Sequence, residues 1–160
     1  MFGLDTYHSL FVLNAFLVQL ILLAHFALRK WRFHLAMRYG WLVYMWSIPA
    51  AILSLISLRN GMGWYFWLGG LIYLVWAAFG YFVEYRLRIE WRNSMRWPIL
   101  VPYVVLYLAS VMFFWWPLAL IYKPLWYAYA ALFAISTYLN ITSHKPSARS
   151  SPVQAAGRTA

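Results

Sequence analysis

Five long apolar stretches dominate the chain, separated by short polar connections. They occupy residues 8–28, 40–58, 64–83, 98–121 and 124–142. Each is long enough, at roughly 17–25 residues, to cross a hydrocarbon core of about 30 Å as a helix. Lipid offers backbone amides and carbonyls no hydrogen-bond partners, so segments that cross it must be helical. The pattern predicts an all-α integral membrane protein: a five-transmembrane-helix bundle over residues 1–142, followed by a flexible basic tail over residues 143–160.

Composition supports this class and excludes others. The chain has 160 residues, of which 65% are hydrophobic and 10% charged, against about 45–50% and 25% in ordinary soluble domains. A soluble domain of this size buries only about 68–70% of its unfolded surface, too little to hide so much apolar area. We therefore exclude a soluble globular fold. The absence of cysteine excludes disulfides and thiolate metal sites.

The basic residues gather on one side of the predicted membrane. Eleven of the thirteen fall in the first connection, the third connection and the tail: Arg29, Lys30, Arg32, Arg38, Arg86, Arg88, Arg92, Arg96, Lys145, Arg149 and Arg158. The other side carries only Arg59 and Lys123. The positive-inside rule then predicts an external N-terminus and a cytoplasmic C-terminus, in a multi-pass protein of a bacterial inner (plasma) membrane. This spacing around spans also argues against nucleic-acid binding, which needs a basic patch on a soluble surface.

Short outer connections predict which spans are neighbours. Only residues 59–63 join spans two and three, and residues 122–123 join spans four and five, so each pair should form an antiparallel hairpin. Small residues, which let helix backbones approach closely, predict contacts at Gly69, Gly70, Ala77, Gly80, Ala128, Ala131 and Ala134. Prolines predict kinks at Pro49, Pro102 and Pro117.

The third connection predicts a helix that extends beyond the membrane surface as far as Pro98. Two pairs at a spacing of four residues, Glu84 with Arg88 and Arg86 with Glu90, would support it. Its four arginines, Arg86, Arg88, Arg92 and Arg96, either form a solvated ledge or dock an acidic partner or anionic lipid headgroups.

Few side chains within the spans could carry chemistry. No Asp, Glu, Lys or Arg lies deep in any span, which disfavours a pump or an ion-coupled transporter. His25 is either hydrogen-bonded at the interface or a single axial ligand for a chlorophyll-type pigment. Asn14 and Gln19 are amides at mid-membrane depth that either bond between helices or face a ligand. We find no metal motif and no nucleophile paired with a base.

The aromatic residues, 22% of the chain, leave two interpretations open. Rings such as Tyr73, Trp76 and Tyr107 could bind a planar lipophilic cofactor, such as a quinone, carotenoid or porphyrin-like pigment. They could equally pack helices together or face neighbouring subunits.

Three functions follow as hypotheses. The first is a non-catalytic accessory or scaffolding subunit of a larger membrane complex, with partner subunits or a homo-oligomer around it in the lipid bilayer. The second is a binder or carrier of a lipophilic small molecule, in which His25, Gln19, Asn14, Tyr73, Trp76 and Tyr107 are the candidate ligand-binding residues. The third is an intramembrane lipid-modifying enzyme that would depend on Glu84, His25 and tyrosines.

Overall fold

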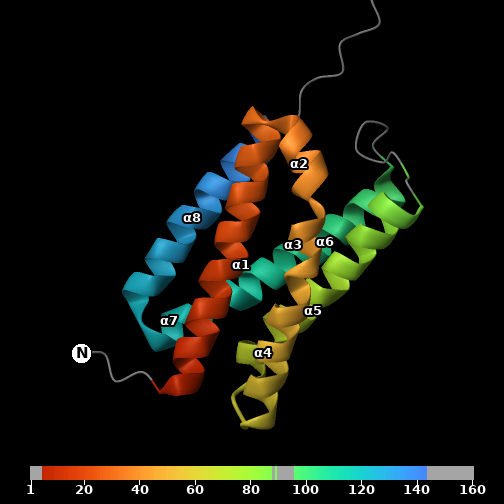
Figure 1. Ribbon diagram of the computed structural model, residues 1–160. Coiled ribbons are helices and arrows are strands. Elements are labelled where there is room, and N and C mark those ends of the chain that lie inside the picture. The colour runs from red at the N-terminus through yellow and green to blue at the C-terminus, as the bar shows by residue number, and fades with distance from the viewer. Residues whose placement is uncertain (1–4, 88, 90–95, 144–160) are drawn as a thin grey trace, which may run out of the picture.

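Helices form all the regular structure in the part of the chain described here. The structure is a computed structural model, and it describes residues 5–87, 89 and 96–143. In chain order the elements are α1 (Thr6–Trp31), α2 (Phe33–Tyr39), α3 (Trp41–Met45), α4 (Ser47–Arg59), α5 (Trp64–Tyr81), the π-helical turn η1 (Phe82–Arg86), α6 (Trp97–Trp115), α7 (Leu118–Ile121) and α8 (Lys123–Thr142) (Figure 1). The all-α prediction is confirmed for these residues.

Within the described residues, four helical stretches are long and apolar enough to cross a membrane. They are Thr6–Trp31, Phe33–Arg59, Trp64–Arg86 and Trp97–Ile121, with mean hydropathies between 1.7 and 2.2. The chain therefore has the architecture of a multi-pass membrane protein. Helix α8 has 20 residues, but tyrosines, Ser136, Thr137 and Asn140 dilute its apolar residues. Its crossing, and with it the fifth span and the orientation of the termini, stays a prediction.

Helices α4 and α5 form the tight hairpin predicted for spans two and three. Gly61 turns the chain with a φ of 70°, a conformation that side chains with a Cβ rarely adopt. Further along, a Cβ at Gly70 would lie only 2.7 Å from the Ala50 carbonyl oxygen. The small residue is therefore what allows the two backbones to meet, and the predicted contact at Gly70 is confirmed.

Helix α8 does not pack as its short connection predicts. Instead of lying closely against α6, it packs mainly along α1, and the two helices run in the same direction (Figure 1). The indole of Trp115 fills the space between α6 and α8, where it stacks on Trp126 at 4.9 Å and meets Phe133 at 5.9 Å. Two bulky rings thus keep the α6 and α8 backbones apart.

The small residues of α8 also differ from the prediction. Ala128, Ala131 and Ala134 are exposed on its outer face, while Tyr129 and Ser136 are buried. The predicted close contacts at these alanines are therefore wrong within the single chain, because the opposite face of α8 packs on α1.

Two of the predicted features, the proline kinks and the helix of the third connection, are seen only in part. Helix α6 runs through Pro102 without interruption, whereas Pro117 separates α6 from α7. The third span ends in the π-helical turn at Arg86, so the predicted helix towards Pro98 does not continue. Glu84 accepts a hydrogen bond from the Tyr44 hydroxyl at 2.7 Å. The predicted partners Arg88 and Glu90 lie outside the described residues.

Candidate ligand-binding site

The second span departs from a regular α-helix at two single residues, Gly40 and Trp46, and the candidate site lies beside them. Helix α2 ends at Gly40, and α3 ends at Trp46 before α4 begins. Pro49 follows three residues after the second break, where its missing N–H leaves one intrahelical hydrogen bond unmade. At Gly40 the chain passes close to two other segments, since a Cβ there would lie 3.3 Å from His25 Cε1 and 3.3 Å from the Tyr85 hydroxyl. Glycine lets the broken span approach α1 and the end of the third span.

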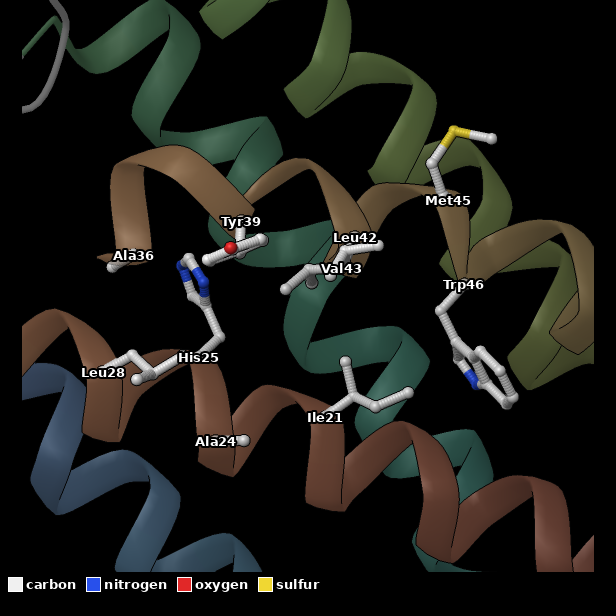
Figure 2. Close-up of a pocket in the computed structure, with 10 residues that line it drawn as sticks. All are labelled: Ile21, Ala24, His25, Leu28, Ala36, Tyr39, Leu42, Val43, Met45 and Trp46. Carbon is white, nitrogen blue, oxygen red and sulfur yellow. The ribbon is translucent and has the colours of Figure 1, made fainter. Parts of the chain in front are cut away.

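A groove of about 420 Å³ opens between α1 and the broken span (Figure 2). One wall comes from α1, with Ile21, Ala24, His25 and Leu28. The other comes from α2, α3 and the residue after α3, with Ala36, Tyr39, Leu42, Val43, Met45 and Trp46. We call this space the His25 groove. Its volume falls in the range of about 300–1,000 Å³ that is typical of small-molecule sites, and its lining is mostly apolar, as such sites are.

His25 places an imidazole at one end of this groove. Figure 2 shows its ring reaching from α1 towards Ala36 and Tyr39 on α2. The ring packs edge-on against Phe26 at 5.7 Å between centroids. At the other end, the indole of Trp46 points from the broken span towards α1 (Figure 2). The Trp46 indole N–H is buried and has no hydrogen-bond partner within the described residues.

Hydrogen bonds to the third span hold α3 in place on the side that faces away from the groove. The Tyr73 hydroxyl donates a hydrogen bond to the Val43 carbonyl at 2.7 Å, and the Tyr44 hydroxyl donates to Glu84. The Ser47 hydroxyl donates to the Tyr44 carbonyl at 2.6 Å, which bridges the break at Trp46. These bonds position Val43, whose side chain lines the groove, without closing the groove itself.

Tyr73, Trp76 and Tyr107 lie close together, but their rings pack against one another in the interior and do not line the groove. Trp76 stacks on Tyr73 at 5.4 Å between centroids, meets Tyr103 at 5.3 Å and meets Tyr107 at 5.8 Å. We call these four rings the aromatic core. Its members join α5 to α6, which supports the packing interpretation of these rings.

The two mid-span amides lie apart from the groove as well. Asn14 donates from Nδ2 to the Ala50 carbonyl at 3.3 Å, so the predicted interhelical hydrogen bond from α1 is confirmed for this residue. Gln19 is fully buried, and its amide atoms have no partner within the described residues. Among the six candidate ligand-binding residues, His25 is the one that lines the groove. Ligand binding by any of them stays a prediction.

Of the four arginines predicted to dock a partner or lipid headgroups, only two lie within the described residues. Arg86 and Arg96 are exposed, while Arg88 and Arg92 lie outside the described residues. Within the described part of the chain, no group of three or more His, Cys, Asp or Glu side chains could hold a metal ion.

Sequence reasoning missed the second wall of the groove. Leu42, Val43 and Trp46 were assigned to the second span, with a kink only at Pro49, and Tyr39 to the connection before it. Nothing in their apolar character sets them apart. The available signal was Gly40 together with Pro49, a helix-weakening residue and a helix breaker nine positions apart.

No family model, curated protein or solved structure matches this chain.

Proposed function

We propose that this chain is a small multi-pass membrane protein that binds a lipophilic molecule in the His25 groove. The observation that supports it is the groove itself, a space of about 420 Å³ lined by apolar side chains and one imidazole where the second span is interrupted. The sequence left this function second to an accessory subunit, and the groove moves it ahead.

A photoreactive alkyl probe tests this proposal. The protein is placed in lipid nanodiscs with a diazirine-bearing fatty alcohol, irradiated, and its labelled peptides are mapped by mass spectrometry. We expect labels to concentrate on the groove walls, around Leu28, Tyr39 and Leu42. Even labelling of all outward helix faces would contradict the proposal.

A matched pair of variants sharpens the test. Ala24→Phe adds a ring inside the groove, and Ala131→Phe adds the same ring to the exposed face of α8. Groove labelling should fall at least fivefold in Ala24→Phe and stay unchanged in Ala131→Phe. Equal labelling in both variants would remove the groove as the site.

The outer face of α8 favours the accessory-subunit hypothesis as a second candidate function. Ala128, Ala131 and Ala134 lie exposed there beside Tyr127 and Tyr138, and small residues are the ones that admit a neighbouring transmembrane helix. Native mass spectrometry in mild detergent should find an assembly larger than one chain, which Ala131→Phe disrupts and Ala24→Phe does not. A lone monomer would contradict this role.

A further inference from the structure

The charged residues on the segments that form the two walls of the His25 groove are all basic, and Glu84 lies behind α3 in a hydrogen bond with Tyr44. Arg29, Lys30, Arg32 and Arg38 fall within ten residues at the connection between α1 and α2 and along α2. The chain has three acidic residues, and none lies between residues 6 and 83. An anion that approaches this connection therefore meets cations with no competing carboxylate on either wall of the groove.

Two of these residues are joined to the end of the groove that contains His25, Arg32 through its backbone and Arg38 through the Tyr39 ring. The Arg32 N–H donates to the Leu28 carbonyl at 2.7 Å, and the Arg32 carbonyl accepts from the Ala36 N–H at 3.1 Å. Leu28 and Ala36 both line the groove, so Arg32 forms the corner that joins its two walls. The Arg38 guanidinium lies 5.6 Å from the centre of the Tyr39 ring, another lining side chain. By contrast, Lys30 reaches over the Tyr138 ring of α8, away from the groove.

The opposite end of the groove is apolar. Ile21 and Trp46 line it there (Figure 2). Ile21 lies seven residues before Leu28 on α1, about 10 Å along the helix axis. The groove thus runs from a cationic corner to an apolar end, which matches a molecule with an anionic head and a hydrocarbon chain.

Exposed aromatic rings show at which depth the cationic corner lies. Trp31, Phe33 and Trp41 are all exposed on the segments that flank the corner. Aromatic side chains beside Lys and Arg at helix ends are typical of the headgroup level of a bilayer. At that depth, the anionic amphiphiles at hand are the phospholipids of the membrane itself.

We infer that the His25 groove binds an anionic phospholipid. Its phosphate lies at Arg32 and Arg38, and one acyl chain lies along Val43 towards Ile21 and Trp46. This inference rests on the proposed function and names the class of its ligand.

Two photoreactive lipids that differ only in headgroup test the inference. Phosphatidylglycerol and phosphatidylcholine, each with the same diazirine-bearing acyl chain, are incorporated at equal fractions into nanodiscs of otherwise neutral lipid. We expect groove peptides to carry about 25-fold more label from phosphatidylglycerol, because the preferences due to two cations multiply. Each cation near an anionic lipid surface is worth about a fivefold preference, so Arg32→Gln and Arg38→Gln should each lower the ratio by about that factor. Arg59→Gln, at the other end of the second span, is the control and should leave the ratio unchanged.

The remaining outcomes separate the inference from the proposed function. Equal groove labelling by the two lipids would overturn the anionic headgroup while the lipophilic site stands. A preference abolished by millimolar glycerol phosphate at constant ionic strength would assign the cations to a soluble phosphate, which also overturns the lipid. Absence of groove labelling by both lipids and by the fatty alcohol would overturn the inference and the proposed function together.

Discussion

The His25 groove and the aromatic core lie on two sides of the same short helix, α3. Both regions are rich in aromatic residues, and they meet at Val43, whose side chain lines the groove while its carbonyl accepts the Tyr73 hydroxyl. In the aromatic core the rings contact each other at 5.3 to 5.8 Å between centroids. In the groove about 420 Å³ remains unfilled. Aromatic content alone therefore does not distinguish a binding site from packing.

The two regions also differ in the regularity of the helices that form them. Helix α5 is unbroken from Trp64 to Tyr81 and offers one continuous face to its neighbours. The second span is divided at Gly40 and Trp46, and the groove lies beside these residues.

The largest expected effect is a difference in stability between two tryptophan variants, one in each region. Trp76 is buried in the aromatic core, whereas Trp46 is half-buried in the groove. We expect Trp76→Ala to cost about 3–5 kcal/mol because it leaves a cavity among packed rings. Trp46→Ala should cost clearly less, because its removal enlarges a space that already exists. Thermal unfolding in detergent, followed by circular dichroism, measures both. Equal losses would break the comparison.

The hairpin of α4 and α5 provides the second test. In Gly70→Ala the new Cβ meets the Ala50 carbonyl at 2.7 Å and also contacts Ser54. The backbone oxygen cannot move aside as a flexible side chain can, so we expect a loss of about 1–3 kcal/mol. Ala78→Leu adds more volume on the exposed face of α5 and should leave the unfolding temperature unchanged. A Gly70→Ala protein as stable as the parent would contradict the close packing.

A smaller effect connects the two regions. Tyr73→Phe removes the hydrogen bond to the Val43 carbonyl, and we expect it to cost about 0.5–1.5 kcal/mol. Because Val43 lines the groove, labelling of the groove by the fatty alcohol should change as well. Tyr127→Phe, on the exposed face of α8, is the control for both measurements. Altered stability with unchanged labelling would show that the two regions are independent.

The smallest effect lies at the start of α1, far from both regions. Asp5 accepts hydrogen bonds from the N–H groups of Tyr7 and His8, and the bond from Tyr7 is the main cause that lowers the pKa of this carboxyl. A lowered folded-state pKa stabilises the protein above the ordinary pKa of the group. That stabilisation is lost as the pH falls through the lowered value.

The variant Asp5→Asn can still cap the helix but does not titrate. The unfolding temperature of the parent should therefore fall more than that of Asp5→Asn between pH 6 and pH 3. Parallel pH profiles for the two proteins would exclude a role for this carboxylate.

The candidate site could be predicted only in part. His25 stands out in the sequence because it is one of the few polar side chains in a mostly apolar span. Tyr73, Trp76 and Tyr107 were reasonable candidates for the same ligand, yet they pack against one another. A sequence gives residue types and spacing, and the same ring serves packing or binding according to what lies opposite it.

Hydrophobic pattern alone determined that this protein is built of long apolar helices, because lipid leaves the backbone no other way to satisfy its hydrogen bonds. The short connection also predicted the hairpin of α4 and α5, in which the small residue Gly70 lets the two backbones meet. Tertiary structure decided that α8 packs on α1 and that the second span breaks beside His25. Those outcomes depend on how large rings and small residues fit across several helices at once, and local sequence does not contain that information.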